Sequence, residues 1–593
     1  MNAPLLKLLR NQIDITRVPF SERGSRLLVY QHTNQPSLYV KLAERLIHVE
    51  PGIESYLHRP PFIDDLCFID EQGTSLEFTT TTSPDVLTFQ THLGDIRLAF
   101  QDEITLVFGL PAHTRTGIRF RARTTHWRKT ETGGELTHVR NIKSGMRNGK
   151  RLRNEIREDG IDSLMEFIVH ADDDCALALH IADDDWSDPV KPFSAVSESA
   201  KRRWDAWFSS TPGVPEAYRS KYAYAWWVMA NNLISPSGFV AHEAMVPTKA
   251  FYVGVWLWDS ALHALAYRHI DPELARNQIR VMLASQLPDG MLPDAIFDEG
   301  VVAEIGHPFH GRVTKPPILA WAAMKIHEVA PDVDFLKEIY EPLKRCNEWW
   351  FKHNDDDRDG VVQYTHPYSS GLDDSPLWDF GMPVESPDIN TYLAMQMECL
   401  AEMAEKIGRR DESLKWHSRS EVQVKRMIDH LWDEESGMFR ALHDESPIPV
   451  VTPFNLLPLW TGKLPQNITK SLLAHLTNPD EFWGRYALPT VAYNDPAYDP
   501  VKMWRGPVWA NINYFVVEAL GRVGRHGLAS ELREKTLKSC GTLGGGCFPF
   551  GCGTKDLDPP GCPAGTGEIL QLTDGQTTRH CCAHLRVERR DVY

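Results

Sequence analysis

The sequence lacks the features that mark a membrane-bound, secreted or nucleic-acid-binding protein. Its 593 residues contain no run of about eighteen or more apolar residues, so we expect no membrane span. The N-terminus begins Met1-Asn2-Ala3-Pro4 and lacks the long apolar segment of a secretory leader. Lys and Arg number 63 against 80 Asp and Glu, and the net charge of −17 argues against nucleic acid as a partner.

Cysteine is sparse in the first 500 residues and concentrated near the end. The four early cysteines are widely spaced: Cys67, Cys175, Cys346 and Cys399. Such spacing is typical of a reducing compartment, so we expect a cytoplasmic protein. The other six of the ten cysteines fall within residues 540–582. No repeat of fixed period is visible, which argues against a solenoid, and the oligomeric state cannot be read from the sequence.

Residues 1–195 are predicted to form an antiparallel β-sandwich. Short strand-like runs separated by turn residues lie at 26–30, 38–46, 86–89, 96–100 and 117–123. In the last run, Ile118, Phe120 and Ala122 alternate with arginines, which places the apolar side chains on one face. Two later runs, 165–169 and 175–181, are expected to pair as a hairpin across residues 171–174.

The pattern changes at about residue 200, and residues 200–548 are predicted to form an all-α domain. One helix is expected to begin at Pro272 with Asp271 as its cap, and another is expected to be capped by Asp388. Long loops rich in Pro, Gly, Asp and Trp favour an α/α toroid, in which one set of loops builds the site. The other predicted helices span 215–233, 315–328, 335–352, 411–432, 466–475, 511–523 and 527–540.

The segment 366–379 has the composition of a functional loop. It contains the carboxylates Asp373, Asp374 and Asp379, together with glycine and proline residues that prevent a regular helix. Tyr368 and Trp378 offer flat apolar faces on which sugar rings stack. The alternative is an acidic surface turn with buried aromatic side chains.

Two further segments, 251–260 and 503–514, combine tryptophan with polar groups before a helix. An aspartate there can accept hydrogen bonds from sugar hydroxyls, and an arginine can hold a carboxylate in a two-point contact. The alternative is an ordinary aromatic core next to helix starts. Three such segments are better explained by one shared pocket for a neutral polyhydroxylated ligand. Their candidate residues are Trp256, Trp258, Asp259, Trp504, Arg505 and Trp509.

The three segments, in this order, resemble glycoside hydrolase family 63 and its bacterial branch of mannosylglycerate and glucosylglycerate hydrolases. The resemblance covers about 200–548, and the β half is similar to the N-terminal domain of glycogen-debranching-like members. It implies an (α/α)6 barrel and inverting hydrolysis of α-glycosidic bonds, and we expect no cofactor and no metal. The matching stretches are Trp256-Leu257-Trp258-Asp259-Ser260, Ser370-Gly371-Leu372-Asp373-Asp374-Ser375-Pro376-Leu377-Trp378-Asp379 and Trp504-Arg505-Gly506-Pro507-Val508-Trp509.

The resemblance also implies roles for individual residues. Asp373 stands at the position of the general acid, Asp374 binds a hydroxyl or tunes its neighbour, and Asp259 binds the sugar at the glycone end. Adjacent residues on a tight turn rarely face one substrate from opposite sides, so Asp373 and Asp374 are not expected to be the acid and base pair. The expected substrate-binding residues are Tyr252, Trp256, Trp258, Asp259, Tyr368, Asp374, Trp378, Trp504, Arg505 and Trp509.

The general base of the family is a Glu in a segment of the form Gly-Cys-Phe-x-Glu-Tyr-Phe. Here Gly546-Cys547-Phe548 is followed by Pro549-Phe550, without that Glu. Residues 549–593 show no apolar helical period, and we interpret them as a frameshifted or disordered tail. The base is therefore predicted to be missing, with Glu568 as a fallback candidate.

These observations lead to one principal hypothesis and two alternatives. The principal hypothesis is an inverting glycosidase acting on an α-glucoside or α-mannoside, impaired if the base is absent. The alternatives are a carbohydrate-binding pseudoenzyme and a glycogen-debranching-type α-glucosidase. Ser369 and Lys315 stand where the glycerate-hydrolysing branch often has Glu and Gln, which argues against a glycerate-type substrate. The segment 355–360 resembles the start of a calcium loop, but its twelfth position is His366, so a capped turn is favoured.

Overall fold

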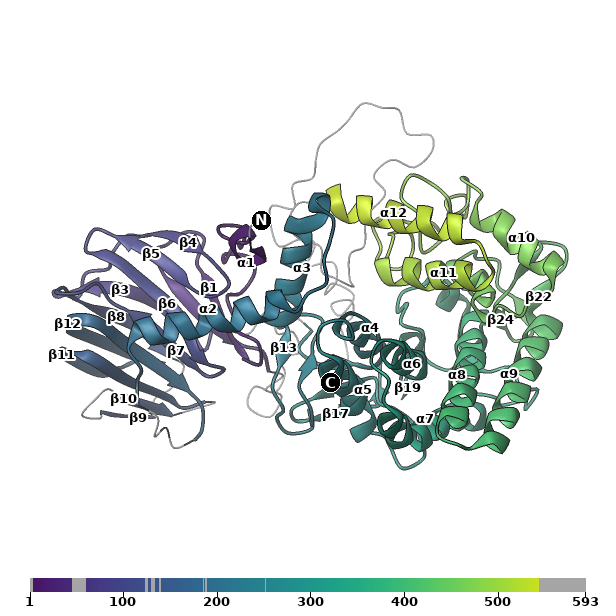
Figure 1. Ribbon diagram of the computed structural model, residues 1–593, viewed down its shortest axis with the longest axis horizontal. Coiled ribbons are helices and arrows are strands. Elements are labelled where there is room, and N and C mark those ends of the chain that lie inside the picture. The colour runs from purple at the N-terminus through teal and green to yellow at the C-terminus, as the bar shows by residue number, and fades with distance from the viewer. Residues whose placement is uncertain are drawn as a thin grey trace. The chain divides into compact units, whose positions relative to one another are not determined.

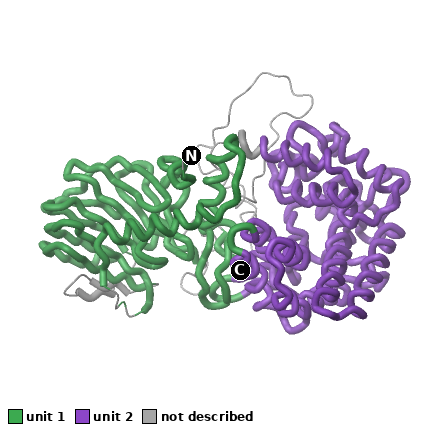
Figure 2. Tube along the Cα trace, viewed as in Figure 1, with its two compact units in different colours: residues 1–255, 269–271, 297–300 green, residues 256–268, 272–296, 301–593 purple. Residues whose placement is uncertain are grey.

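The computed structural model divides into two compact units (Figure 1). One comprises Met1–Val255, His269–Asp271 and Phe297–Gly300 and is called the β unit (Figure 2). The other comprises Trp256–Arg268, Pro272–Ile296 and Val301–Tyr593 and is called the helical unit. The structure describes residues 4–44, 60–122, 126–129, 134–137, 140–160, 162–184, 186, 189–250 and 252–542.

The β unit is built on one curled, twelve-stranded antiparallel sheet (Figure 1). In β8, Ile118, Phe120 and Ala122 are buried, as their alternation with arginines predicts. Three strands lie off the main path, because β11 (Ile142–Asp159) also pairs with β12 and continues to β10 (Gly134–Thr137) and β9 (His126–Lys129). The main order is β1 (Leu27–Gln31), β2 (Leu38–Leu42), β3 (Ile63–Asp70), β8 (Arg115–Ala122), β12 (Asp162–Ile181), β7 (Thr105–Gly109), β6 (Gly94–Asp102), β5 (Leu87–Thr91) and β4 (Thr79–Thr82).

The hairpin predicted across residues 171–174 is wrong, because β12 continues through them. The first half of β12 pairs with β8, the second half pairs with β7, and β11 follows both halves. Asp174 on β12 has φ of 58° and Asn148 on β11 has φ of 56°, and the register of the two strands shifts between Arg147 and Gly149. The backbones of β11 and β12 are therefore irregular at the same place, as in a β-bulge. The two strands stay paired on both sides of it, so β12 does not turn back as a hairpin.

A helix that the sequence analysis missed, α2 (Phe193–Ser209), covers part of this sheet. Its apolar residues Phe193, Val196 and Ala200 pack against alanine and valine side chains of β6, β7 and β12. Small side chains on the strands let the helix approach closely, since a Cβ at Gly109 would lie only 2.4 Å from the Phe193 ring. The helix is therefore part of the core of the β unit.

Helices make up most of the helical unit, and the predicted ones lie within a few residues of their expected positions. Besides α2, the helices of the β unit are α1 (Leu5–Leu8), η2 (Glu216–Tyr218) and α3 (Arg219–Asn231). Those of the helical unit are α4 (Leu257–Tyr267), α5 (Pro272–Ala284), α6 (Leu319–Val329), α7 (Val333–His353), α8 (Pro387–Lys406), α9 (Arg410–Leu431), η5 (Pro453–Asn455), η6 (Leu457–Thr461), α10 (Gln466–Leu476), α11 (Ala510–Arg522) and α12 (His526–Thr542).

The loops between these helices contain only short strands among the described residues. The first of them are β13 (Leu233–Ile234), β14 (Ala244–Met245), β15 (Val255–Trp256), β16 (Ala295–Phe297), β17 (Gly300–Val302), β18 (Glu304–Ile305) and β19 (Gly311–Arg312). The later ones are β20 (Gln363–Tyr364), β21 (Val384–Glu385), β22 (Trp432–Asp433), β23 (Met438–Phe439), β24 (Leu442–His443) and β25 (Ser446–Pro447).

Alternate helices of the helical unit pack against one another in chain order. α4 contacts α6, α6 contacts α8, α8 contacts η6, and η6 contacts α11. Aromatic rings fill the space between them: Trp460 of η6 stacks on Phe515 of α11 at 5.1 Å and meets Trp321 of α6 edge-on at 5.0 Å. Trp258 of α4 lies 6.5 Å from Phe515, which brings the first and last members of the series together.

Two helix starts differ in detail from the predictions. The residue before α8 is Ser386, so Asp388 lies inside the first turn and is not the cap. Its carboxylate accepts hydrogen bonds from Ser386 and from the Tyr364 hydroxyl, and burial raises its pKa to about 6. α4 begins at Leu257 and therefore also includes Asp259 in its first turn. α5 begins at Pro272 directly after Asp271, as predicted.

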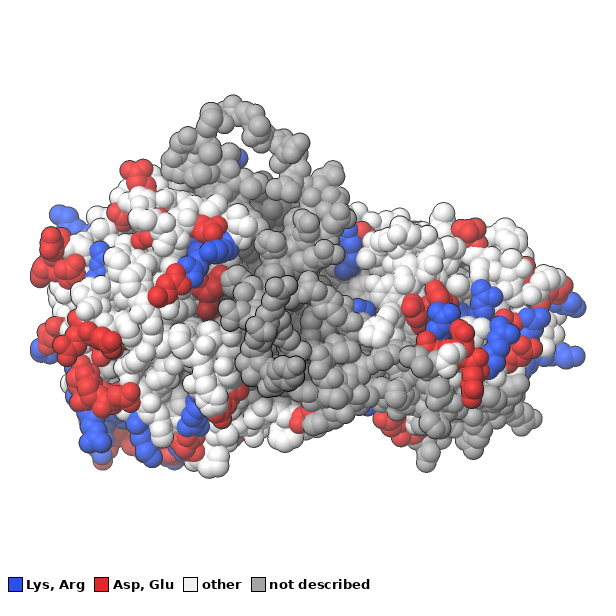
Figure 3. Space-filling view, turned by 180° about the vertical axis from the view of Figure 1, so that it is seen from behind, with Lys and Arg blue, Asp and Glu red and all other residues white. Residues whose placement is uncertain are grey.

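Neither the described helices nor the face drawn in Figure 3 has an unusual distribution of charged residues. None of the helices in the described part of the chain is both long enough and apolar enough to cross a membrane. Acidic and basic side chains lie side by side on the face drawn in Figure 3. The excess of acidic residues is therefore spread among basic ones on this face.

Trp460→Ala tests whether the aromatic cluster is the core of the helical unit. Trp460 is fully buried, so we expect a loss of about 3–5 kcal/mol in the stability of this unit. Leu414→Ala, at a side chain that is 63% exposed, is the matched control and should change little. The midpoint of thermal unfolding of the full chain measures both. Equal midpoints for the two variants would contradict this account of the core.

Candidate functional site

The loop 366–379 is shaped by two short 3-10 turns and one glycine. η3 (Pro367–Ser370) begins after His366, whose Nδ1 accepts a hydrogen bond from the Tyr368 amide at 3.2 Å. The Ser370 hydroxyl donates to the Pro367 carbonyl and accepts from the Leu372 amide, at 2.7 and 3.0 Å. η4 (Pro376–Phe380) follows, and the chain between the two turns carries Asp373 and Asp374. Local hydrogen bonds therefore fix the backbone around these carboxylates.

Gly371 fits this loop closely against α4. Its φ of +79° lies in the left-handed region, which favours glycine. A Cβ at this position would lie 2.5 Å from the ring of Trp258. Glycine is thus required twice, for its backbone conformation and for the contact with the tryptophan next to Asp259.

The loop is also joined to the segment before α11. The carboxylate of Asp374 accepts a hydrogen bond from the Trp504 amide at 2.8 Å. Arg505 donates two hydrogen bonds to the two oxygens of Asp379, at 2.6 and 2.7 Å. The predicted two-point contact of this arginine with a carboxylate is present, and the carboxylate is that of Asp379 in the loop 366–379. Within the helical unit, the loop 366–379 therefore contacts both Trp258 of the first segment and residues 504–505 of the third.

A buried lysine lies beside Asp373. The Nζ of Lys315 is 3.5 Å from Oδ1 of Asp373 and 3.1 Å from Oδ1 of Asp294. It also donates a hydrogen bond to the Tyr368 carbonyl and lies 5.9 Å from the Tyr368 ring centre. The side chains of Lys315 and Asp294 are each 6% exposed, whereas that of Asp373 is 36% exposed. Asp373 is thus the most accessible of these three side chains.

The carboxyls of this cluster hold their protons more strongly than ordinary aspartates. Burial raises the pKa of Asp373 to about 6; the Lys315 ammonium opposes this rise, and the charges of Asp294 and Asp374 add to it. Burial likewise raises the pKa of Asp259 to about 6, again opposed by Lys315. A carboxyl with such a pKa is partly protonated near neutral pH, which is the state that a general acid needs.

Sequence reasoning missed the buried partners of the acid. In the sequence, Lys315 is marked only as a departure from the pattern of the family, and no motif contains Asp294. Asp294 follows Pro293 in a loop without an aromatic neighbour, so nothing local marks it as functional. Its indole partner, Trp256, donates a hydrogen bond to its carboxylate. Only the fold reveals this contact, because α4 and α5 separate the two residues in the sequence.

The tryptophans of the site are mostly buried. Trp258, Trp378 and Trp504 are 6%, 7% and 5% exposed. Trp504 stacks on Trp509 with ring centres 4.0 Å apart, and the Trp378 indole donates to the Leu372 carbonyl at 2.8 Å. These contacts show that the rings support the loops. Their role as platforms for a sugar stays a prediction.

Two predicted site residues are not placed in this cluster. Tyr252 belongs to the β unit and is exposed, so its part in the site stays a prediction. Glu568 and the interpretation of residues 549–593 as a tail lie outside the described residues.

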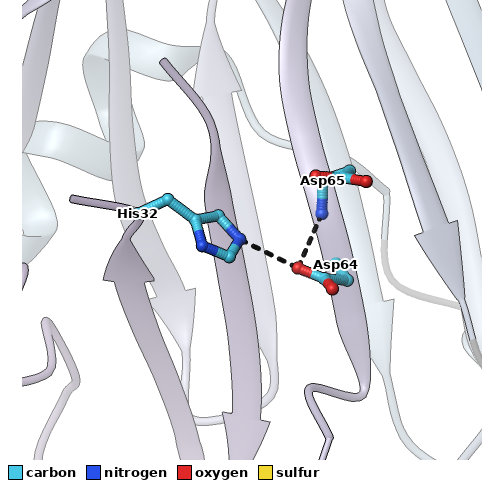
Figure 4. A group of neighbouring side chains, drawn as sticks. All are labelled: His32, Asp64 and Asp65. Carbon is cyan, nitrogen blue, oxygen red and sulfur yellow. Dashed lines mark hydrogen bonds and ion pairs between the residues drawn. The ribbon is translucent and has the colours of Figure 1, made fainter. Parts of the chain in front are cut away.

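Three groups of described residues have carboxylate or histidine atoms close enough to share a cation. In the β unit, His32 Nε2 lies 2.9 Å from Asp64 Oδ1, which also accepts the Asp65 amide (Figure 4). The Asp65 carboxylate is in turn bound by Gln35 and Arg121, at 2.9 and 3.1 Å. An arginine on one ligand disfavours a cation there, so this group is better explained as an ion-pair network.

The calcium-like segment also forms a cluster. Asp355, Asp357 and Asp359 approach one another, and Asp359 lies near Glu385 and His430. Backbone amides of Asp359, Gly360 and Val361 donate to these carboxylates, as in a capped turn. That the chain needs no metal stays a prediction.

Gly371→Ala tests how closely the loop 366–379 fits against α4. The added methyl group meets the Trp258 ring, and the left-handed backbone adds strain of about 1 kcal/mol or more. Gly408→Ala is the matched control, because Gly408 has φ of +84° but nothing within 4 Å of its Cβ position. We expect Gly371→Ala to lower the thermal midpoint more than Gly408→Ala. Equal effects would mean that backbone strain alone accounts for the loss.

Comparison with known proteins places these segments in a family. Residues 252–548, about half of the chain, match the mannosylglycerate hydrolase MGH1-like glycoside hydrolase domain. A mannosylglycerate hydrolase of Thermus thermophilus is 28% identical over 373 residues, which cover 49% of this chain and 87% of that protein. A glucosylglycerate hydrolase of Mycolicibacterium hassiacum is 23% identical over 380 residues, which cover 48% of this chain and 84% of that protein.

The chain is also similar to a probable glucosidase and to a solved structure. A probable mannosyl-oligosaccharide glucosidase of Schizosaccharomyces pombe is 27% identical over 225 residues, which cover 33% of this chain and 28% of that protein. The solved structure of a GH63 mannosylglycerate hydrolase from Thermus thermophilus in complex with glucose is 25% identical, covers 52% of this chain and 90% of that chain, and has a TM-score of 0.46. From the match over 252–548, the chain belongs to the mannosylglycerate hydrolase MGH1-like glycoside hydrolases.

Proposed function

We propose that the chain is an inverting glycoside hydrolase that cleaves an α-glucoside or α-mannoside with Asp373 as its general acid. The observation that carries this proposal is that the Asp373 carboxyl is accessible and binds its proton more strongly than an ordinary aspartate. Its carboxyl is 36% exposed on a braced loop, lies within the family match, and has its pKa raised to about 6 by burial. A proton held in this way is available for the glycosidic oxygen of a bound substrate.

In the proposed reaction, Asp373 donates its proton to the leaving oxygen while the bond to the sugar breaks. In the same displacement, an ionised carboxylate about 6.5–9.5 Å from the acid takes a proton from a water on the opposite face of the ring, and the oxygen of this water forms the new bond to the anomeric carbon as the old bond breaks. Asp374 is a poor candidate for this base, since its carboxylate already accepts the Trp504 amide. Asp259 is assigned to the sugar at the glycone end.

No general base is assigned among the described residues, and the Glu that the family carries after Gly-Cys-Phe is absent here. Glu568 remains the fallback candidate, and the missing Glu after Phe548 favours a chain of reduced activity. A carbohydrate-binding pseudoenzyme is the alternative that follows if no base exists. Binding of sugar without turnover, in the full chain, distinguishes the pseudoenzyme from the enzyme.

The substrate is proposed to be a glycoside with a neutral rather than a glycerate aglycone. The relatives named above include hydrolases of mannosylglycerate and glucosylglycerate and a probable glucosidase of mannosyl-oligosaccharides. Lys315 is engaged by two carboxylates and is not free to bind a third from glycerate. A glycogen-debranching-type activity on longer glucans is the second candidate, favoured by the β unit that precedes the matched residues.

The finer architecture is part of the same proposal. The series of contacts from α4 through α6, α8 and η6 to α11 supports an (α/α)6 toroid with these helices inside. The curled sheet supports a sandwich of two layers joined by long strands such as β12. Cys67, Cys175, Cys346 and Cys399 are free thiols, which supports a cytoplasmic location.

Asp373→Asn tests the acid directly. The amide cannot donate the proton, so we expect release of sugar from a panel of α-glucosides and α-mannosides to fall by about 100-fold or more. Asp334→Asn is the control, since Asp334 is an exposed carboxylate of the same unit with 91% of its side chain accessible. Equal rates for the parent and Asp373→Asn would contradict the assignment of Asp373.

The pH dependence of kcat/KM gives a second test. Asp373 must be protonated to act, and its pKa is about 6 in the folded chain. Activity is therefore expected to be retained below this value and to fall as the pH rises through it. The measurement is kcat/KM for the best substrate of the panel across the pH range. A profile without a fall on the alkaline side would exclude this group as the acid.

A further inference from the structure

Lys315 is placed by the short stretch between β19 and α6, where two prolines follow it. Pro316 and Pro317 restrict the backbone here, so the lysine side chain leaves the chain in a fixed direction. The side chain is almost fully buried, and the Tyr368 carbonyl and the Asp294 carboxylate occupy its ammonium. The remaining direction points to Asp373, whose Oδ1 lies 3.5 Å away.

The charges around this ammonium are unbalanced. Asp294 and Asp373 pair with it, Asp259 also acts on it, and Asp374 acts on Asp373. The Tyr368 ring faces the same groups and is neutral. One positive charge therefore serves several carboxylates. Burial alone would lower the pKa of Lys315, but Asp294, Asp373 and Asp259 outweigh this effect and raise it above its ordinary value, so the ammonium stays charged.

We propose that Lys315 is a positioning residue that holds the Asp373 carboxyl in place and sets how strongly it binds its proton. This inference rests on the proposed role of Asp373 as the acid. Asp294 and the Tyr368 carbonyl anchor the Lys315 ammonium, so its distance from the Asp373 carboxyl is fixed. Asp294 thereby acts on Asp373 indirectly, because it holds the lysine that contacts Asp373.

The physical consequence of losing the lysine charge has a definite sign. A nearby cation favours the ionised form of a carboxyl and lowers its pKa by about 1–3 units. Without Lys315, burial and the charges of Asp294 and Asp374 would act on Asp373 unopposed. Asp373 would then hold its proton to higher pH. A lysine that served only to fill space would leave this proton equilibrium unchanged.

The test compares three variants of the full chain. Lys315→Met removes the charge and keeps an unbranched side chain, whereas Lys315→Arg keeps the charge. Lys325→Met is the matched control, because Lys325 of the same unit also pairs with a carboxylate, Glu518, at 3.0 Å. In Lys315→Met we expect the alkaline limb of kcat/KM to move up by about one pH unit or more. Lys315→Arg and Lys325→Met should keep the limb of the parent.

A second measurement reads the proton on Asp373 without turnover. Carbodiimide activates protonated carboxyls for coupling to an amine, and Asp373 is accessible enough to react. The rate of labelling of Asp373, followed by peptide mass spectrometry against pH, is expected to have its midpoint near 6 in the parent and higher in Lys315→Met. Unchanged midpoints in Lys315→Met would overturn the inference. A shifted midpoint in a chain that hydrolyses no glycoside would support Lys315 and reject the proposed activity.

Discussion

The site depends on an ammonium group buried among carboxylates. Lys315 contacts Asp294 at 3.1 Å and Asp373 at 3.5 Å, and it is nearly inaccessible to water. Burying an unpaired charge is costly, so the lysine and its carboxylates must be accommodated together. The loop that carries Asp373 is in turn fixed to its neighbours by Asp374, Asp379 and Gly371. Asp373 is thus held both by its contact with a charged group and by the close fit of its loop.

This arrangement explains why three distant parts of the chain carry similar composition. The start of α4 supplies Asp259 and Trp258, the loop 366–379 supplies Asp373, and the segment before α11 supplies an amide and an arginine. Each part contributes polar groups to the cluster or the loop, and each contains a buried tryptophan. Trp378 supports its own loop, since its indole donates a hydrogen bond to the Leu372 carbonyl.

Most helices and strands were predictable from residue patterns, and the predictions that were wrong or missing have physical causes. Helices from α5 to α12 follow apolar periods of helical spacing, and strands such as β8 follow alternation. The hairpin across 171–174 was wrong, because pairing of β12 with β11 outweighs a local turn signal. α2 was missed, because its boundary follows an acidic, proline-containing stretch that resembles a linker. Asp294 was missed, because its partner Lys315 is supplied by the fold and not by its neighbours in the chain.

The stereochemistry of the first product tests the central claim most directly. Proton NMR of a cleaved α-glycoside, recorded before the released sugar equilibrates between its anomers, shows which anomer the full chain forms. An inverting enzyme with a single acid and an activated water gives the β-anomer first. Release of the α-anomer first would contradict the account, because it would require a covalent intermediate on a nucleophile close to Asp373.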